Sequence, residues 1–305
     1  MPFFDSYDGL RLFFDEVGEG PPLVVLPGGP GTDVRYVGDL GGLSSTRTLI
    51  RLDARASGRS GVPEDRDTVS FVEQARDVEQ LRLHLGADRL DILAHSAGCL
   101  TAQEYAAARP GRVRRLILVT PVGRAAREPD HAELAALRES RRGEPWYEQA
   151  AAGDAALRRG GLSHAEEIMA RARMIPFSWH RWTPERRRAE YVPGHATALP
   201  WLRDAFYRNS RDRVERSAAG PELLAAAGPG VLAAAGPQLL AAAGPGVLVV
   251  AGASDGLIGT APARLVAAAH PGSRLEVMTE SGHRPWAEQP DRFRSLVESF
   301  LAAAG

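Results

Sequence analysis

The chain has 305 residues, of which 44% are hydrophobic and 25% charged, a composition that excludes a disordered chain. The formal net charge of -1 gives no basic excess that would indicate a nucleic-acid partner, and the single cysteine excludes an internal disulfide bond. All 37 basic residues are arginine, so chemistry that needs a lysine amine, such as a Schiff base or a P-loop, is excluded as well.

The N-terminal residues carry no recognisable targeting signal. Asp5 and Asp8 interrupt the first apolar residues, so neither the basic nor the apolar region of a signal peptide can form. No later stretch approaches the ~18 uncharged apolar residues that a membrane-spanning helix needs. We therefore expect a cytoplasmic protein with no membrane partner.

Short apolar runs bounded by glycine, proline or charged residues predict strands that are buried on both faces. They occupy residues 23–26, 48–52, 90–94, 113–119, 247–251 and 275–278. Helical spacing of apolar residues predicts helices over 71–85, 100–108, 265–269 and 293–301. This alternation predicts the α/β class, with a doubly wound and mostly parallel sheet.

A glycine-rich loop, residues 27–31, follows the first of these strands. Glycines leave backbone N–H groups free to point into a site, and such a donor can stabilise a developing oxyanion. A phosphate-binding loop is disfavoured, because no lysine follows and the G-x-G-x-x-G spacing is absent. We predict that the amide of Gly29 is one oxyanion donor.

The strand 90–94 leads through His95 into Ser96, and a helix follows at once. Small residues flank the serine, Ala94 two positions before it and Gly98 two positions after it. A serine on such a strand-to-helix turn is typical of a nucleophile elbow, because only small flanks let strand and helix approach closely. We predict that Ser96 is a nucleophile and that the amide of Ala97 is the second oxyanion donor.

The alternation of strands and helices stops at Pro121 and resumes at Val247. The stretch between them is rich in charge and in tryptophan, and it carries helical patterns over 133–140 and 165–173. The simplest interpretation is a helical insertion into the sheet. We predict a core formed by residues 1–121 and 247–305, and a helical cap formed by residues 122–246.

The predicted cap ends in an alanine-rich repeat over residues 220–245, where Gly-Pro recurs every eight residues. Proline at this spacing forbids one long helix. The period matches none of the solenoid repeats of 20 residues or more. We interpret the repeat as a duplicated segment that leads into the next strand, with a binding role as the alternative.

Two further residues complete a catalytic pattern. Asp255 follows the strand 247–251, and His283 follows the strand 275–278, so both are expected at the carboxyl edge of the sheet. Serine, acid and histidine in this chain order form the triad order of the α/β-hydrolase fold. In that arrangement Ser96 attacks, His283 accepts and returns its proton, and Asp255 orients the imidazole.

The chain resembles the proline iminopeptidase-like branch of the α/β-hydrolase superfamily over nearly its whole length, apart from the Gly-Pro repeat. The resemblance rests on residues 27–31 for His-Gly-Gly-Pro-Gly, on residues 53–60 for Asp-Gln-Arg-Gly-x-Gly-x-Ser, and on Ser96, Asp255 and His283. It implies an α/β-hydrolase fold with an inserted helical cap that roofs a pocket over the serine.

Two cap positions depart from that resemblance. The family's cap glutamates hold the free amino terminus of the substrate, and the matching positions here carry Thr183 and Arg203. Replacing acids by these residues removes the attraction for an ammonium group and adds repulsion. Asp204 would compensate through a shift of one residue. The aminopeptidase specificity is therefore left open.

Other candidate residues have a structural and a functional interpretation. Trp179 and Trp182 either pack in the cap or line the substrate pocket, and we predict them as substrate-binding residues. The histidines of the cap show no metal-ligand spacing, so we expect no metal site and no cofactor. Cys99 is expected to be a small buried apolar residue.

We predict a serine hydrolase that cleaves an ester or amide of a small, largely apolar substrate through an acyl-enzyme. One alternative is a prolyl aminopeptidase, which keeps the enzyme class. Another is a ligand-binding or non-hydrolytic member of the fold, such as one that cyclises a metabolite. The partner is expected to be a small molecule, and the sequence does not indicate the oligomeric state.

Overall fold

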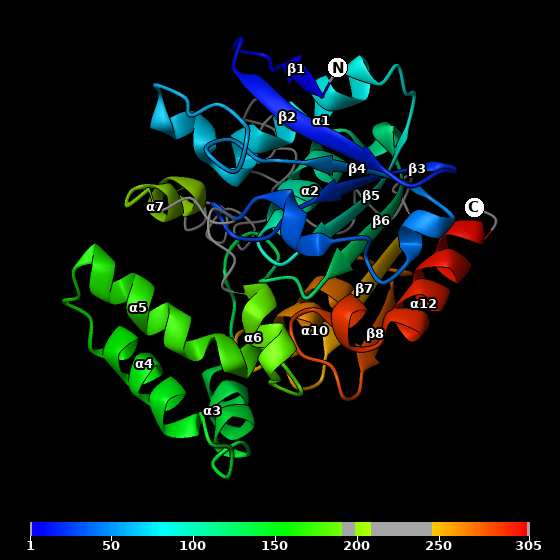
Figure 1. The fold of residues 1–305 in the computed structure, drawn as a ribbon. Coiled ribbons are helices and arrows are strands. Elements are labelled where there is room, and N and C mark those ends of the chain that lie inside the picture. The colour runs from blue at the N-terminus through cyan, green and yellow to red at the C-terminus, as the bar shows by residue number, and fades with distance from the viewer. Residues whose placement is uncertain (1, 191–198, 209–245, 304–305) are drawn as a thin grey trace, which may run out of the picture.

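The computed structural model describes residues 2–190, 199–208 and 246–303, and it contains an eight-stranded sheet in the order β1-β2-β4-β3-β5-β6-β7-β8 (Figure 1). The strands are β1 (Phe3–Asp5), β2 (Arg11–Val17), β3 (Pro22–Leu26), β4 (Thr48–Leu52), β5 (Leu90–His95), β6 (Val113–Val119), β7 (Gly246–Gly252) and β8 (Arg274–Met278). The Gly-Pro repeat predicted over 220–245 lies outside the described residues.

The sheet is mostly parallel. β2 pairs with β1 and with β4 in antiparallel orientation, and every other pairing is parallel. All six predicted strands are present, and the predicted fold class is confirmed. The antiparallel pair β1 and β2 was not predicted from the sequence.

Two layers of helices cover the sheet, one on each face. The α-helices of these layers are α1 (Phe71–His84), α2 (Gly98–Ala108), α10 (Ala261–Ala268), the single turn α11 (Pro285–Glu288) and α12 (Pro290–Ala302). Apolar side chains of α1, α2 and α10 pack on one face, and those of α11, α12 and the 3-10 helices η1 (Val34–Val37) and η2 (Leu43–Ser45) pack on the other. Along β3 the side chains alternate between these layers, which is why the strand reads as a continuous apolar run.

Helices form the described part of the stretch between β6 and β7. They are α3 (His131–Glu139), α4 (Tyr147–Arg159), α5 (His164–Met174), the 3-10 helix η5 (Ile175–Ser178), α6 (Pro184–Glu190) and α7 (Leu202–Tyr207). In Figure 1, α3, α4 and α5 project away from the sheet, and α7 lies apart from them beside the core. No described helix of the chain is both long and apolar enough to cross a bilayer.

The segment 53–60, on which part of the resemblance rests, holds the core together behind the site. Arg55 is fully buried, and its guanidinium donates to both carboxylate oxygens of Asp77 at 2.6 Å. It also pairs with Asp8. The carboxylate of Asp53 accepts the backbone N–H groups of Val34 at 2.8 Å and Arg59 at 3.0 Å. These contacts tie β4 to α1 and to the loop that carries the glycines.

Replacing Arg55 tests this linkage. Arg55→Met keeps the aliphatic length and removes the charge, so Asp77 is left buried without its counterion, and the free energy of unfolding in urea should fall by about 3–5 kcal/mol. Arg112→Met breaks a pair whose partner Asp88 is 84% exposed, and it should cost at most about 1 kcal/mol. Equal losses in the two variants would contradict this assignment.

Candidate active site

The three residues predicted as a triad lie together at the carboxyl edge of the sheet. Ser96 follows β5, Asp255 follows β7, and His283 follows β8. His283 Nε2 lies 3.0 Å from Ser96 Oγ, and His283 Nδ1 lies 2.6 Å from Asp255 Oδ2. One imidazole thus joins a hydroxyl to a carboxylate, although the three residues are far apart in the chain.

The hydrogen bonds of Asp255 determine which nitrogen of His283 carries the proton. Asp255 is 1% exposed, and its Oδ1 accepts the N–H groups of Leu257 at 3.0 Å and Ile258 at 3.2 Å. With Oδ1 occupied in this way, Oδ2 accepts the Nδ1–H of His283. The Nε2 lone pair then faces Ser96, whose hydroxyl donates to it. That tautomer suits a general base.

The backbone at Ser96 is held in the left-handed region, with φ +52°. Only a close approach of strand and helix allows this turn, and glycine makes the approach possible. A Cβ on Gly98 would lie 2.3 Å from the carbonyl oxygen of Pro27, and a Cβ on Gly28 would lie 2.9 Å from Cβ of Ser96. The glycine loop and the elbow therefore touch backbone to backbone.

The two predicted oxyanion donors lie on these touching segments. Among the described residues, neither the N–H of Gly29 nor that of Ala97 donates a hydrogen bond. Ala97 directly precedes α2, so its amide belongs to the positive end of that helix. Both amides are available to an anionic oxygen, and their role as oxyanion donors stays a prediction.

The backbone of His283 is held by groups that the sequence did not reveal. Its N–H donates to the carbonyl of Ser178 at 2.6 Å, and its carbonyl accepts from His95 Nε2 at 3.0 Å and from Thr120 Oγ1 at 3.1 Å. These partners come from η5, β5 and the end of β6. No local pattern marks them, because the contacts arise only once the strands converge.

The helical segment is bonded to the loops that carry the acid and the histidine. The N–H of Gly256 donates to the carbonyl of Phe177 at 2.8 Å, and Arg138 Nε donates to the carbonyl of Gly256 at 2.8 Å. The buried carboxylate of Glu288 accepts the N–H groups of His180 at 3.1 Å and Gly282 at 2.7 Å. The positions of Asp255 and His283 therefore depend on this helical segment as well as on the sheet.

The two tryptophans predicted to bind substrate have different environments. Trp179 is 3% exposed, and its indole N–H donates to Glu190 at 2.9 Å. Arg284, the neighbour of His283, pairs with the same carboxylate at 3.0 Å. Trp182 is half-buried. Trp179 lies in this closed cluster near the histidine, and substrate binding by either tryptophan stays a prediction.

Thr183 and Arg203 stand where the family carries glutamates, so neither position supplies a carboxylate that could bind an ammonium group. Arg203 lies on α7, with its guanidinium 5.2 Å from the ring centre of Tyr207, and burial lowers its pKa to about 10. Asp204 is exposed. Phe206, from the same helix, belongs to the apolar cluster that contains Ala97. The position on α7 that matches the family's acid therefore carries a cation.

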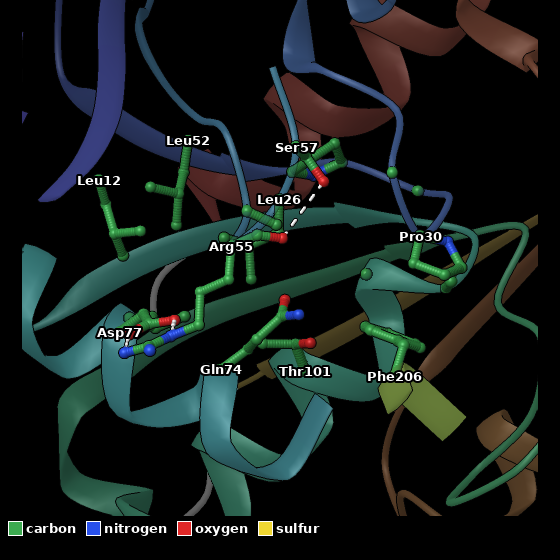
Figure 2. A pocket seen from close by; sticks show the side chains of 17 residues that line it. Leu12, Leu26, Pro30, Leu52, Arg55, Ser57, Gln74, Asp77, Thr101 and Phe206 are labelled. Carbon is green, nitrogen blue, oxygen red and sulfur yellow. Dashed lines mark hydrogen bonds and ion pairs between the residues drawn. The ribbon is translucent and has the colours of Figure 1, made fainter. Parts of the chain in front are cut away.

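A narrow cavity lies behind the glycine loop, and Ser96 and His283 do not line it. Figure 2 shows Arg55 and Asp77 at one end, Pro30 and Phe206 at the other, and Thr101 between them. Ala97 and Gly28 also line the cavity, and about 30 Å³ inside it is open to the centres of water molecules. That space accommodates about two waters or a very small organic group.

Cys99 lies one helical turn after Ser96 and is fully buried. Its thiol contacts the carbonyl oxygens of Ala94 at 3.3 Å and Val119 at 3.6 Å. Burial raises the pKa of this thiol well above its usual range. Cys99 therefore packs as a small apolar residue, as the sequence led us to expect.

Comparisons with known proteins agree with this architecture. A family model described as alpha/beta hydrolase fold matches residues 21–288. A proline iminopeptidase of Heyndrickxia coagulans is 33% identical over 121 residues, 39% of this chain and 42% of that protein. A probable proline iminopeptidase of Streptomyces coelicolor is 32% identical over 126 residues, 37% of this chain and 38% of that protein. The matches thus span about two fifths of these relatives.

Among solved structures, an esterase from Exiguobacterium antarcticum superposes with a TM-score of 0.66 at 18% identity, over 99% of both chains. A hydrolase from Pseudomonas aeruginosa superposes with a TM-score of 0.65 at 23% identity, over 99% of this chain and 98% of that one. At such low identity the likeness shows the fold alone.

The contact between Gly98 and Pro27 generates a test of the elbow. Gly98→Ala forces a methyl group to within 2.3 Å of a backbone oxygen, so the helix must shift away from the glycine loop. We expect the melting temperature to fall and hydrolysis to drop by about 100-fold, the cost of a displacement near 1 Å. Gly111→Ala, with no atom within 4 Å of the new methyl, is the matched control. Unchanged activity in both variants would contradict the steric argument.

Proposed function

Because the chain belongs to the family with the alpha/beta hydrolase fold, we propose that it is a hydrolase and that Ser96, His283 and Asp255 form its catalytic triad. The single observation that carries the proposal is the unbroken chain of hydrogen bonds from Ser96 Oγ through the imidazole to Asp255. In known triads this arrangement raises the nucleophilicity of the serine and stabilises the imidazolium that forms.

The proposed reaction follows from these contacts. Ser96 Oγ attacks the carbonyl carbon of the substrate while its proton passes to His283 Nε2. The carbonyl oxygen becomes an anion, which the amides of Gly29 and Ala97 stabilise. The tetrahedral intermediate then expels the alcohol or amine, which takes the proton from Nε2 and leaves an acyl group on Ser96.

Water completes the cycle. His283 Nε2 removes a proton from the water as its oxygen attacks the acyl carbon, and the same proton returns to Ser96 Oγ when the carboxylic acid leaves. The carboxylate of Asp255 keeps the imidazole in one tautomer and balances its transient charge. The mechanism uses no metal and no cofactor.

We propose a small, largely apolar ester or amide as the substrate, bound between the core and a cap formed by residues 122–246. The apolar side chains of Leu100, Phe206 and Ile258 cluster with Ala97, the neighbour of Ser96, and support an apolar substrate. The esterase among the solved structures has the same fold, and this adds no evidence on the substrate.

Proline iminopeptidase activity is the second candidate, favoured by the names of the relatives matched over part of the chain. It requires a free carboxylate near the substrate's ammonium group. Arg203 places a cation on α7 instead, Asp204 is exposed, and Glu190 is already paired with Arg284. These contacts support a simple ester or amide over an aminoacyl substrate. Cyclisation, in which an internal nucleophile replaces water, uses the same triad.

Removing the hydroxyl of Ser96 tests the proposal. Ser96→Ala should lower kcat on a p-nitrophenyl ester by about 10⁴-fold or more and abolish labelling by a fluorophosphonate, since the nucleophile is gone. The circular dichroism spectrum and melting temperature should stay those of the wild type. Ser140→Ala, at an exposed serine of the helical segment, is the control. Full labelling of Ser96→Ala would refute the assignment.

The charge on α7 generates a separate prediction about specificity. The wild-type protein should hydrolyse p-nitrophenyl acetate with a kcat/KM at least about tenfold above that for prolyl-β-naphthylamide, because like charges disfavour an ammonium group. Arg203→Glu should raise kcat/KM for the prolyl substrate alone. Arg188→Glu, at an exposed arginine of α6, should leave both values unchanged. A wild-type preference for the prolyl substrate would show that the aminopeptidase specificity is retained.

A further inference from the structure

His95, the last residue of β5, joins two segments of the site through its ring. The side chain is buried, Nδ1 lies 2.6 Å from the hydroxyl of Tyr36, and Nε2 lies 3.0 Å from the backbone carbonyl of His283. The same hydroxyl accepts the N–H of Gly28 at 2.7 Å. An unbroken chain of hydrogen bonds therefore runs from the glycine loop to the histidine of the triad.

The hydrogens in this chain are fully determined by their partners. A carbonyl oxygen only accepts, so Nε2 of His95 must carry a proton and donate to His283. A neutral ring then has its lone pair at Nδ1, so the hydroxyl of Tyr36 donates to Nδ1. That hydroxyl oxygen in turn accepts from Gly28. The Tyr36 hydroxyl and the His95 ring thus each donate one bond and accept one, and no other arrangement of a neutral ring satisfies all the partners.

The packing around His95 keeps its ring neutral and fixed. The ring lies edge-on to Trp286 at 4.8 Å between centres and 4.7 Å from the ring of His283. Burial lowers the pKa of His95 well below its usual range, and electrostatic interaction with His283 and Arg284 lowers it further. Arg284 lies 4.8 Å from the centre of the Tyr36 ring and is paired with Glu190.

We propose that Tyr36 and His95 form a buried bridge that sets the position of His283 relative to the oxyanion loop. The proposal rests on the triad proposed above. Gly28 directly precedes Gly29, so one end of the bridge fixes the loop that carries a donor, and the other end fixes the backbone of the general base. Both are positioning residues, because neither contacts the reacting atoms. Catalysis depends on such distances to within about 1 Å.

Three substitutions cut the bridge at different bonds. Tyr36→Phe removes only the hydroxyl. His95→Asn places an amide near the Nδ1 position and loses the bond to His283, whereas His95→Gln reaches the Nε2 position and loses the bond to Tyr36. Each variant should lower kcat for a p-nitrophenyl ester by about 10- to 100-fold with KM within about twofold, because the substrate still binds while the base is misplaced.

The double variant Tyr36→Phe/His95→Asn distinguishes a bridge from independent packing. Once one bond is cut, cutting the other changes nothing further, so its kcat should equal that of the single variants. Tyr105→Phe and His270→Asn are matched controls, since both change a buried polar side chain whose hydrogen bond, to Glu79 or to the carbonyl of Val266, involves no residue of the site. They should lower the melting temperature at most and leave kcat within about twofold.

Proton NMR gives a readout that does not need turnover. The Nδ1–H of His283, bonded to Asp255 at 2.6 Å, should give a low-field resonance that shifts or broadens in the bridge variants and not in the controls. If the wild type neither hydrolyses esters nor reacts with a fluorophosphonate, the proposed function fails, and the bridge is then judged on this resonance alone.

Independent losses that multiply in the double variant would overturn the bridge. A kcat of Tyr36→Phe within twofold of the wild-type value would also overturn the bridge. Tyr36→Phe removes a single oxygen, so it decides between the two outcomes if the His95 variants do not fold. An unchanged NMR resonance in all bridge variants would have the same meaning.

Discussion

The parallel pairing of β5, β6, β7 and β8 is the constraint on which the site depends. Pairing in register brings the carboxyl ends of these strands to one edge of the sheet. The ladder continues past the strand ends, since Ser96 N–H donates to the carbonyl of Val119 at 2.9 Å and Thr120 N–H to that of Val250 at 2.7 Å. The loops of the site therefore begin from fixed points, and short loops suffice to bring Ser96, Asp255 and His283 together.

The elements that could be predicted from the sequence are those marked by a pattern of neighbouring residues in the chain. Buried parallel strands read as apolar runs, and the small flanks of Ser96 mark the elbow. β2 escaped prediction because Asp15 and Glu16 interrupt its apolar residues, and only the structure shows Asp15 paired with Arg51 at 2.7 Å. Tyr36 and Ser178 could not be predicted for a different reason. Each contacts a residue more than 50 positions away, and no pattern of nearby residues indicates such a contact.

The helical segment between β6 and β7 is bonded to the loops of the candidate site. Its backbone at Phe177 and Ser178 is bonded to the loops of Asp255 and His283, so a change in those helices is transmitted to the triad without touching it. Its charged groups near the site are largely paired: Arg186 with Glu288, and Glu190 with Arg284. In the function proposed above, neutralised pairs of this kind would favour substrates without a formal charge.

Cys99 lies one helical turn after Ser96, and its burial keeps its thiol unreactive beside the proposed nucleophile. Its thiol contacts the carbonyl oxygens of Ala94 and Val119. Because burial raises the pKa of the thiol, it stays protonated and does not supply the thiolate that reacts with electrophiles. The single cysteine of the chain therefore offers no accessible sulfur for a disulfide bond to a second molecule.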